Sequence, residues 1–301
     1  MLVSAQIDAH LPALTPAERR VAAVVADDPE AVAFGTVADV ARRAGTSGAT
    51  VVRLAAKLGF EGFVDLQAAV REELARRLRP ASERIRRPAP GDVLGSALAT
   101  EMANVAATLE PVDRQAFGAA VTLLSGAPDR AGRNRGTDRP PLGRGGARAA
   151  PRVFVLSGDA SAGVASLFAG ELSMLRPGVV LVGGSEVRVA RLLADIGAAD
   201  VVVVIDLARY DRAVLDATGR AAGAGAAVVA LTDSALSPLA AAATVSFAAS
   251  VTGAGPFDSH VGLLALANAL LAGIAARLRR SATDRLDRVE SAWREAAVLT
   301  D

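Results

Sequence analysis

Between residues 36 and 60, apolar side chains recur at the spacing of two short helices. Gly45 separates the two stripes, because glycine readily adopts the left-handed conformation that ends a helix, and Ser47 is placed to cap the second helix. Gly59 closes that helix. The pattern predicts a helix-turn-helix whose buried face carries Val37, Val40, Ala41, Val51, Leu54, Ala55 and Leu58.

The opposite face of the second helix is predicted to show small, hydroxyl-bearing and cationic side chains. Such a face suits the major groove of DNA, although a helical hairpin with a solvated polar face would read the same way. Basic residues around the helix would supply the attraction for phosphate. These are Arg42, Arg43, Arg53 and Lys57, and the candidate DNA-binding residues are Thr46, Ser47, Ala49, Thr50, Arg53 and Lys57.

The segments on either side of this stretch also predict helices. Upstream, Thr15 is placed as a cap, Pro16 occupies the first helical position and Glu18 can reach back to the cap, which predicts a helix through Ala26. Downstream, the glycine turn leads into an amphipathic pattern that predicts a helix from about residue 63 to about residue 79.

Four short motifs occur in order within about sixty residues. They are Leu-Thr-Pro-Ala-Glu-Arg-Arg-Val at 14–21, Pro-Glu-Ala-Val-Ala-Phe at 29–34, Ser-Gly-Ala-Thr-Val-Val-Arg-Leu at 47–54 and Lys-Leu-Gly-Phe at 57–60. With them the segment from Leu14 to about Leu74 resembles the N-terminal DNA-binding domain of the MurR/RpiR family of bacterial transcriptional regulators. The resemblance implies that Thr50, Arg53 and Lys57 belong to the DNA-facing helix.

The second half of the chain changes to short β-branched runs that alternate with helical segments. Continuous apolar strands between helices predict a parallel sheet covered on both faces, a doubly wound α/β domain whose ligand lies at the carboxyl ends of the strands. Two helices, over 93–109 and 113–124, are predicted before it. The five predicted strands are Val153–Leu156, Val179–Val182, Val201–Ile205, Ala227–Leu231 and Thr244–Phe247.

Residues 150–280 resemble the sugar isomerase (SIS) domain that MurR/RpiR regulators carry after their DNA-binding domain. The matching segments are 153–161, 225–234 and Ser-Pro-Leu at 237–239. The resemblance implies a phosphosugar held by hydroxyls and by backbone amides at helix N-termini. The candidate effector-binding residues are Ser157, Ser161, Arg209, Thr232, Ser234 and His260.

One loop departs from the pattern of that family. Where SIS domains place Ser-x-Ser-Gly-x-Thr around the phosphate, residues 206–211 read Asp-Leu-Ala-Arg-Tyr-Asp. Two carboxylates repel a phosphate dianion and Arg209 attracts one. Three interpretations therefore stay open: a sugar phosphate bound by Arg209, a different small metabolite, or a degenerate domain that serves only for dimerisation.

A sugar-phosphate isomerase is the alternative functional class, because the SIS fold also supports aldose-ketose isomerases. Such an enzyme needs a positioned base, and the candidates are His10, His260, Glu171 and Glu186. The segment 157–161 lacks the glycine spacing of a dinucleotide-binding loop, and no metal-ligand pattern is visible. We therefore expect a regulator rather than an enzyme, with no cofactor and no metal.

Composition supports a two-domain protein outside the membrane. The chain has 301 residues, 51% of them hydrophobic, no cysteine and a net charge of +1. The first residues lack the pattern of a signal peptide, which predicts a cytoplasmic protein. The run from Val261 to Leu278 contains Asn268 and Arg277, and it indicates a core or interface helix rather than a membrane span. Residues 1–80 carry ten basic and ten acidic side chains, so bulk charge does not argue for DNA.

The sequence predicts five segments and an oligomer. The segments are a helix-turn-helix domain over 1–79, a linker with connecting helices over 80–127, a disordered basic insertion over 128–151, an SIS-like domain over 152–280 and a C-terminal helix over 281–301 with Val289 and Trp293 on its packed face. The expected partners are double-stranded DNA and a small effector, which in the family's pattern is a phosphosugar. The protein is expected to bind them as a homodimer or homotetramer. Paired recognition helices about 34 Å apart would favour a near-palindromic operator.

Overall fold

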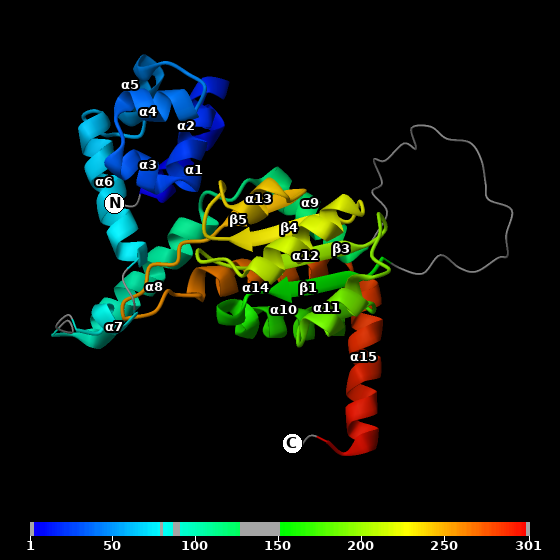
Figure 1. Cartoon of the computed structure of the whole chain (residues 1–301). Helices are drawn as coiled ribbons and strands as arrows, with labels where there is room; N and C mark the ends of the chain where they lie inside the picture. The colour runs from blue at the N-terminus through cyan, green and yellow to red at the C-terminus, as the bar shows by residue number, and fades with distance from the viewer. Residues whose placement is uncertain (1–2, 79–80, 87–90, 127–150, 299–301) are drawn as a thin grey trace, which may run out of the picture. The chain divides into compact units, whose positions relative to one another are not determined.

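The computed structural model describes residues 3–78, 81–86, 91–126 and 151–298. It forms two compact units, each built from more than one stretch of the chain (Figure 1). Unit 1 comprises Met1–Pro111, Thr232–Ala241 and Phe247–Leu263, and unit 2 comprises Val112–Leu231, Ala242–Ser246 and Leu264–Asp301. The predicted basic insertion at 128–151 lies outside the described residues apart from Pro151, and the predicted linker at 80–90 is described only in part.

Unit 1 contains the predicted helical bundle, whose apolar stripes meet in one core. Val21, Val32, Val40, Leu54 and Leu66 are all fully buried there, so five successive helices contribute to the same interior. The elements are α1 (Val3–His10), a 3₁₀ turn (Leu11–Ala13), α2 (Pro16–Asp27), α3 (Pro29–Phe34), α4 (Val37–Arg43), α5 (Gly48–Lys57), α6 (Phe63–Leu78), α7 (Ala81–Arg84) and α8 (Val93–Leu109).

The predicted start and stop signals act as expected at three helix ends. Thr15 and Glu18 form the capping box of α2, with the Thr15 N–H donating to the Glu18 carboxylate at 2.8 Å. Gly45 and Gly59 end α4 and α5 with φ angles of 58° and 86°, in the left-handed region where a Cβ is costly. A second capping box, which the sequence did not predict, joins Thr36 and Asp39 at the start of α4.

A buried polar network fixes α8 to the segment 249–261 within unit 1. Asn104, which is 1% exposed, donates to the Thr252 carbonyl at 2.7 Å and accepts from the Ser250 hydroxyl at 2.9 Å. Glu101 accepts from the Ser259 hydroxyl at 2.5 Å, and the Thr108 hydroxyl accepts from the Ser250 N–H at 2.9 Å. Paired in this way, buried polar groups specify one position of the loop on the helix.

The predicted strands form a five-stranded sheet with the order β2-β1-β3-β4-β5. β1 pairs in parallel with both β2 and β3, and β3 pairs in parallel with β4, so Val153 lies opposite Val179 on one side and Val201 on the other. This order places a topological switch point between β1 and β3. The strands are β1 (Val153–Ser157), β2 (Val179–Val182), β3 (Val201–Ile205), β4 (Ala227–Thr232) and β5 (Val245–Ala248).

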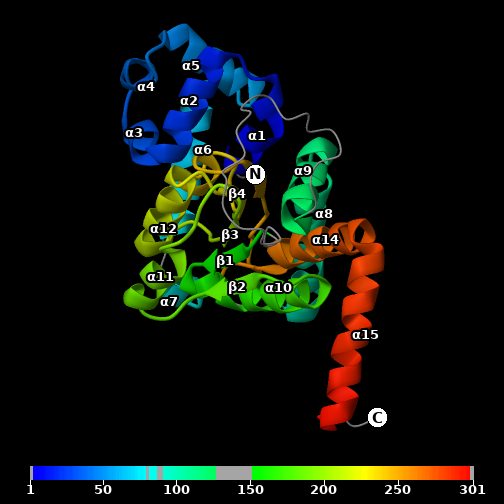
Figure 2. The same ribbon diagram turned by 90° about the vertical axis from the view of Figure 1, so that its right-hand side faces the viewer.

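Helices cover the sheet on both faces, as the apolar strands predict. Figure 2 shows α11 and α12 on one face, with α10 and α14 on the other. Each residue of β3 is buried, as expected for a central strand. The helices and the second 3₁₀ turn are α9 (Arg114–Ser125), the turn Asp159–Ser161, α10 (Ala162–Leu175), α11 (Glu186–Leu193), α12 (Arg212–Gly223), α13 (Pro238–Ala241), α14 (Val261–Arg277) and α15 (Arg279–Ala296).

The two C-terminal helices differ in how far they are buried. The apolar side chains of α14, such as Leu266, Leu270 and Ile274, are fully buried inside the chain, so α14 is a core helix. Val289 and Trp293 of α15 are only half-buried. Among the described helices none is by itself long and apolar enough to cross a membrane, and α14 and α15 meet that criterion only as a pair bent by 102°.

Arg176 joins three backbone carbonyls inside unit 2. Its side chain donates to the carbonyls of Leu124 at 2.7 Å and Pro177 at 3.1 Å, and also to that of Pro151. The residue is only 4% exposed, and burial lowers the pKa of its guanidinium. Arg176 therefore connects the end of α9 to the segment that leads into β1.

We expect Arg176→Ala to destabilise the protein by about 2–4 kcal/mol, because three carbonyls lose their donor and a cavity remains. Urea denaturation followed by circular dichroism measures this change, and Arg191→Ala, which removes an exposed arginine of α11, is the control. An unchanged denaturation midpoint in Arg176→Ala would show that the buried guanidinium contributes no net stability.

Candidate DNA-binding face and effector site

The exposed face of α5 is a single stripe of four residues. Ala49, Val52, Arg53 and Ala56 are all exposed, and they follow the i, i+3, i+4, i+7 spacing of one helix face. Val52 leaves 44% of its surface exposed, although it is apolar. A stripe of small and apolar side chains with one guanidinium can enter a major groove closely.

Thr50 does not share that face, so the expectation that it points away from the core is wrong. It is 4% exposed, because its position on the helix brings it to the edge of the buried stripe. Its hydroxyl lies 3.1 Å from that of Ser47 and accepts from Arg53 at 3.0 Å. Ser47 occupies the N-cap position, yet its side chain makes no capping bond to the backbone.

Lys57 is also turned away from the predicted DNA-facing side. Its ammonium donates to the Ala13 carbonyl at 2.7 Å and to the Glu18 carboxylate at 3.0 Å. The side chain of Glu18 is 9% exposed, so this ion pair is largely shielded. Lys57 therefore joins the end of α5 to the start of α2.

The charges around the turn are mostly paired within the bundle. Arg42 pairs with Asp39 at 2.6 Å and Arg43 pairs with Asp28. Among the basic residues of α4 and α5 described here, Arg53 is the one without a carboxylate partner. Its charge is therefore the most available for a phosphate or a base.

Arg20 of α2 fixes the turn between α4 and α5. Its guanidinium donates to the carbonyls of Ala44 at 3.0 Å and Gly45 at 3.3 Å. The Thr46 N–H donates to the Ala41 carbonyl at 2.9 Å, and Thr46 is half-buried. These bonds set the angle at which α5 leaves the turn.

Two carboxylates of the bundle have lowered pKa values. The pKa of Glu18 is lowered first by the Thr15 N–H that donates to it and then by Lys57. The pKa of Asp39 falls to about 2, mainly because the Thr36 hydroxyl and N–H donate to it, with Arg42 a smaller cause. Both groups are therefore held as carboxylates at neutral pH.

Sequence reasoning missed Val52 and Ala56 as members of the exposed face. Val52 and Ala56 stand three and seven residues after Ala49, so helical spacing alone places them on the same face. The prediction followed polar residue types and named Thr50 and Lys57 instead. Neither of those two could be assigned from spacing alone, since each lies at the border between the two faces of α5.

The predicted effector residues are divided equally between the two units. In unit 2, Ser157 ends β1 and is half-buried, whereas Ser161 is fully buried at the start of α10. Arg209 is exposed and has a φ of 75°, a left-handed conformation that costs a non-glycine residue about 1 kcal/mol. The residue lies in the loop between β3 and α12.

The buried Asp206 carboxylate holds this loop together through hydrogen bonds from the loop backbone. Asp206 is 5% exposed, and its two oxygens accept from the N–H groups of Leu207 at 2.9 Å and Asp211 at 2.8 Å. Gly158, which follows β1, packs against this carboxylate so closely that a Cβ would overlap it. Asp211 in turn caps α12 through the Ala213 N–H at 2.8 Å.

In unit 1, the other three predicted residues have contacts within the chain. Thr232 is fully buried and Ser234 is 7% exposed, while His260 is half-buried. Asp8 of α1 accepts from the Ala235 N–H at 3.0 Å and from the Ser234 hydroxyl at 3.4 Å. The loop after β4 is therefore held to α1, a contact that sequence reasoning did not predict.

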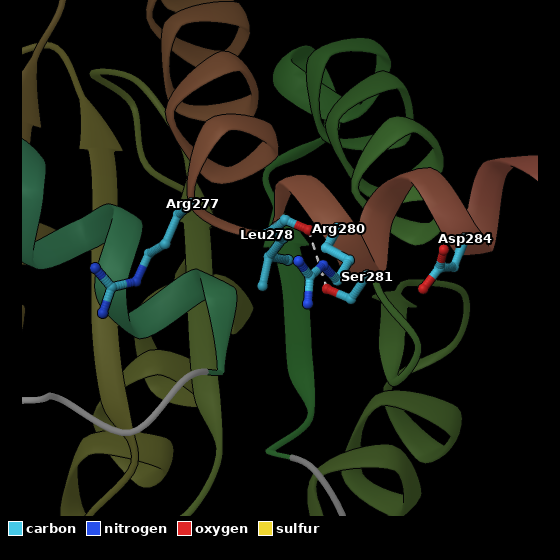
Figure 3. Close-up of a pocket in the computed structure, with 5 residues that line it drawn as sticks. All are labelled: Arg277, Leu278, Arg280, Ser281 and Asp284. Carbon is cyan, nitrogen blue, oxygen red and sulfur yellow. Dashed lines mark hydrogen bonds between the residues drawn. The ribbon is translucent and has the colours of Figure 1, made fainter.

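A surface hollow of 280 Å³ lies where α14 meets α15, within unit 2. Figure 3 shows Arg277 directed away from Arg280 and Ser281, and the Ser281 hydroxyl donates to the Leu278 carbonyl at 3.0 Å. No predicted effector residue lines this hollow. Among the described residues, no group of three or more His, Asp or Glu side chains could hold a metal ion.

The folds define a class of protein: a helix-turn-helix bundle joined to a doubly wound α/β domain. Residues 1–77 match the helix-turn-helix domain of the rpiR family, and residues 148–273 match the SIS domain. The chain belongs to the MurR/RpiR family of DNA-binding transcriptional regulators, as the sequence motifs predict.

Solved structures that are similar to this chain include the following two. One is the sugar isomerase domain of an RpiR transcription factor from Sphaerobacter thermophilus, with 28% identity, a TM-score of 0.55 and coverage of 66% of this chain and 99% of that one. The other is the Vibrio vulnificus NanR protein complexed with ManNAc-6P, with 19% identity, a TM-score of 0.57 and coverage of 100% of both chains, which supports the fold alone. No curated protein matches the sequence.

The Glu18–Lys57 ion pair predicts how the bundle responds to acid. The folded-state pKa of Glu18 lies below its usual value of 4.5, so its contribution is complete above that pH and is lost as the pH falls through the folded-state pKa. We expect Lys57→Met to destabilise the bundle by about 1–2 kcal/mol at neutral pH and to shift its loss of stability towards pH 4.5.

Thermal unfolding between neutral pH and about pH 3 measures both effects. Arg42→Met is the matched control, because it also removes one cation of an ion pair, but the Arg42 side chain is 74% exposed whereas that of Lys57 is 34% exposed. Equal melting curves for Lys57→Met and the wild type would contradict the structural role of Lys57.

Proposed function

We propose that this protein regulates transcription by inserting the exposed face of α5 into the major groove of its operator. The observation that carries the proposal is Arg53, a guanidinium on an exposed stripe of small and apolar residues and without a carboxylate partner in the described chain. A guanidinium can donate two bonds to the O6 and N7 atoms of guanine. The paired Arg42 and Arg43 would then strengthen binding through phosphate.

The start of α5 suits a backbone phosphate of the same DNA. The Ser47 side chain makes no capping bond, so the amides of Gly48 and Ala49 are not occupied by it. Amides at a helix start donate well to phosphate oxygens, and such contacts position a recognition helix without reading sequence. We therefore assign phosphate contact to Gly48 and Ala49, and base contact to Arg53.

The SIS domain would control this DNA binding through a carbohydrate derivative. The first support is the family itself, and NanR, which has the same fold, is complexed with ManNAc-6P. The second is the topological switch point between β1 and β3, where ligands bind in open α/β sheets. Effector binding needs to favour one arrangement of paired DNA-binding domains by only a few kcal/mol to change occupancy.

An isomerase is the weaker candidate. Glu171 of α10 and Glu186 of α11 are both exposed to solvent, whereas a general base must be held within hydrogen-bond reach of the proton that it abstracts. The His10 ring nitrogen Nδ1 bonds to the Gln6 carbonyl at 2.8 Å. The exposure of both glutamates favours a sensor domain over a catalytic one, and we propose that this domain acts in a homodimer or homotetramer.

Fluorescence anisotropy of the intact protein with DNA from its own upstream region tests the proposal. We expect binding that is specific relative to scrambled DNA and that weakens steeply as salt rises, because phosphate contacts release counterions. Equal affinity for both DNAs at every salt concentration would contradict a regulator that reads this region.

Arg53 variants separate base contact from phosphate contact. We expect Arg53→Ala to weaken specific binding about 5–150-fold, the loss of 1–3 kcal/mol from one bidentate base contact. Arg53→Lys should retain the salt dependence but lose specificity, because an ammonium cannot reproduce the two-pronged geometry. Arg220→Ala, which removes an exposed arginine of α12, is the control for charge removal, and unchanged affinity in both Arg53 variants would refute the assigned face.

A further inference from the structure

The loops after β1 and β3 meet at the switch point of the sheet. Ser157 and Ile205, the last residues of the two strands, lie opposite each other in the parallel register. The next residues, Gly158 and Asp206, therefore lie side by side, and the Gly158 N–H donates to the Ile205 carbonyl at 3.3 Å. In an open α/β sheet this is the place where a ligand is expected.

Two backbone N–H groups of the β3–α12 loop donate to one anion, the side-chain carboxylate of Asp206. The Asp206 oxygens each accept from an amide, one from Leu207 and one from Asp211. Converging amides before a helix are a general solution for binding phosphate. Here a carboxylate that is 5% exposed takes these donors instead.

Two features show that the Asp206 carboxylate is built into this position. The loop folds around it, with Arg209 in a left-handed conformation at φ 75°. Gly158 leaves room for the carboxylate, since a Cβ at that residue would overlap it. The φ angle of Gly158, −67°, suits any residue, so space and not backbone conformation calls for glycine here. Asp211 adds a second carboxylate at the start of α12.

We propose that Asp206 determines effector specificity by filling the anion site at the β1/β3 switch point, so that the effector is an uncharged carbohydrate rather than a sugar phosphate. This inference rests on the proposed function of the domain as a carbohydrate sensor. A phosphate at this loop would meet a buried like charge and find two amide donors already used. Neutral hydroxyls avoid that repulsion and need no further anion site. An ammonium group on the effector would gain little binding energy from Asp206, because both oxygens of the buried carboxylate already accept a hydrogen bond.

Isothermal titration of the intact protein with inorganic phosphate tests the inference at this loop. Asp206→Ser removes the carboxylate and leaves the amides of Leu207 and Asp211 without their acceptor. We expect phosphate to bind Asp206→Ser at least about tenfold more tightly than it binds the wild type, because converging amides favour an anion. Asp216→Ser, which removes an exposed carboxylate from α12, should behave as the wild type. A folded Asp206→Ser protein with no gain in phosphate affinity would overturn the proposal.

The wild-type protein gives a second arm that does not depend on the variant folding. Glucose 6-phosphate is compared with glucose, and ManNAc-6P with ManNAc, by the same titration. A phosphorylated sugar that binds no better than its parent supports the proposal, and one that binds more tightly overturns it, whether Arg209 or another group holds the phosphate. Neither arm uses DNA, so a failure of DNA binding would count against the regulator alone.

Discussion

The organisation of this chain depends on how the backbone N–H groups at helix starts find acceptors. The first amides of a helix have no partner within it, so a side chain, a ligand or water must accept from them. Side-chain oxygens of this protein fill that role at α2, α3, α4, α8, α9, α11 and α12. At α5 the Ser47 hydroxyl lies beside that of Thr50 instead, and the start of the helix that we propose for DNA recognition is not capped by its N-cap side chain.

The same need for acceptors applies at both candidate sites. In the helix-turn-helix, the bonds from Lys57 to Glu18 and from Arg20 to the turn carbonyls hold α5 from both ends. Among the described basic residues of α4 and α5, Arg53 is the one without a carboxylate partner, and it is the residue that we propose for DNA contact. In the α/β domain, Asp206 satisfies the amides at the switch point from inside. The amides at the start of α5 are thus left open to an external anion, whereas those at the switch point of the sheet are already bound to Asp206.

Sequence periodicity predicted most of the fold because burial sets it. The five strands lie within one residue of their predicted positions, and the capping box of Thr15 and Glu18 forms as expected. The sites were harder to predict, because Thr50 and Lys57 lie at the border between two faces and their orientation depends on tertiary partners. The Asp206 loop shows the same limit: its composition indicated repulsion of phosphate, but only the fold shows the carboxylate turned inward onto its own amides.

Residue-resolved amide hydrogen exchange of the intact protein tests this account most directly, since it reports whether each amide has an acceptor. We expect slow exchange of the Leu207 and Asp211 amides in the free protein, unchanged by added phosphate. At the Gly48 and Ala49 amides we expect fast exchange that slows when operator DNA is added. Fast exchange at Leu207 and Asp211 that slows only with phosphate, or no effect of DNA at the start of α5, would contradict the account.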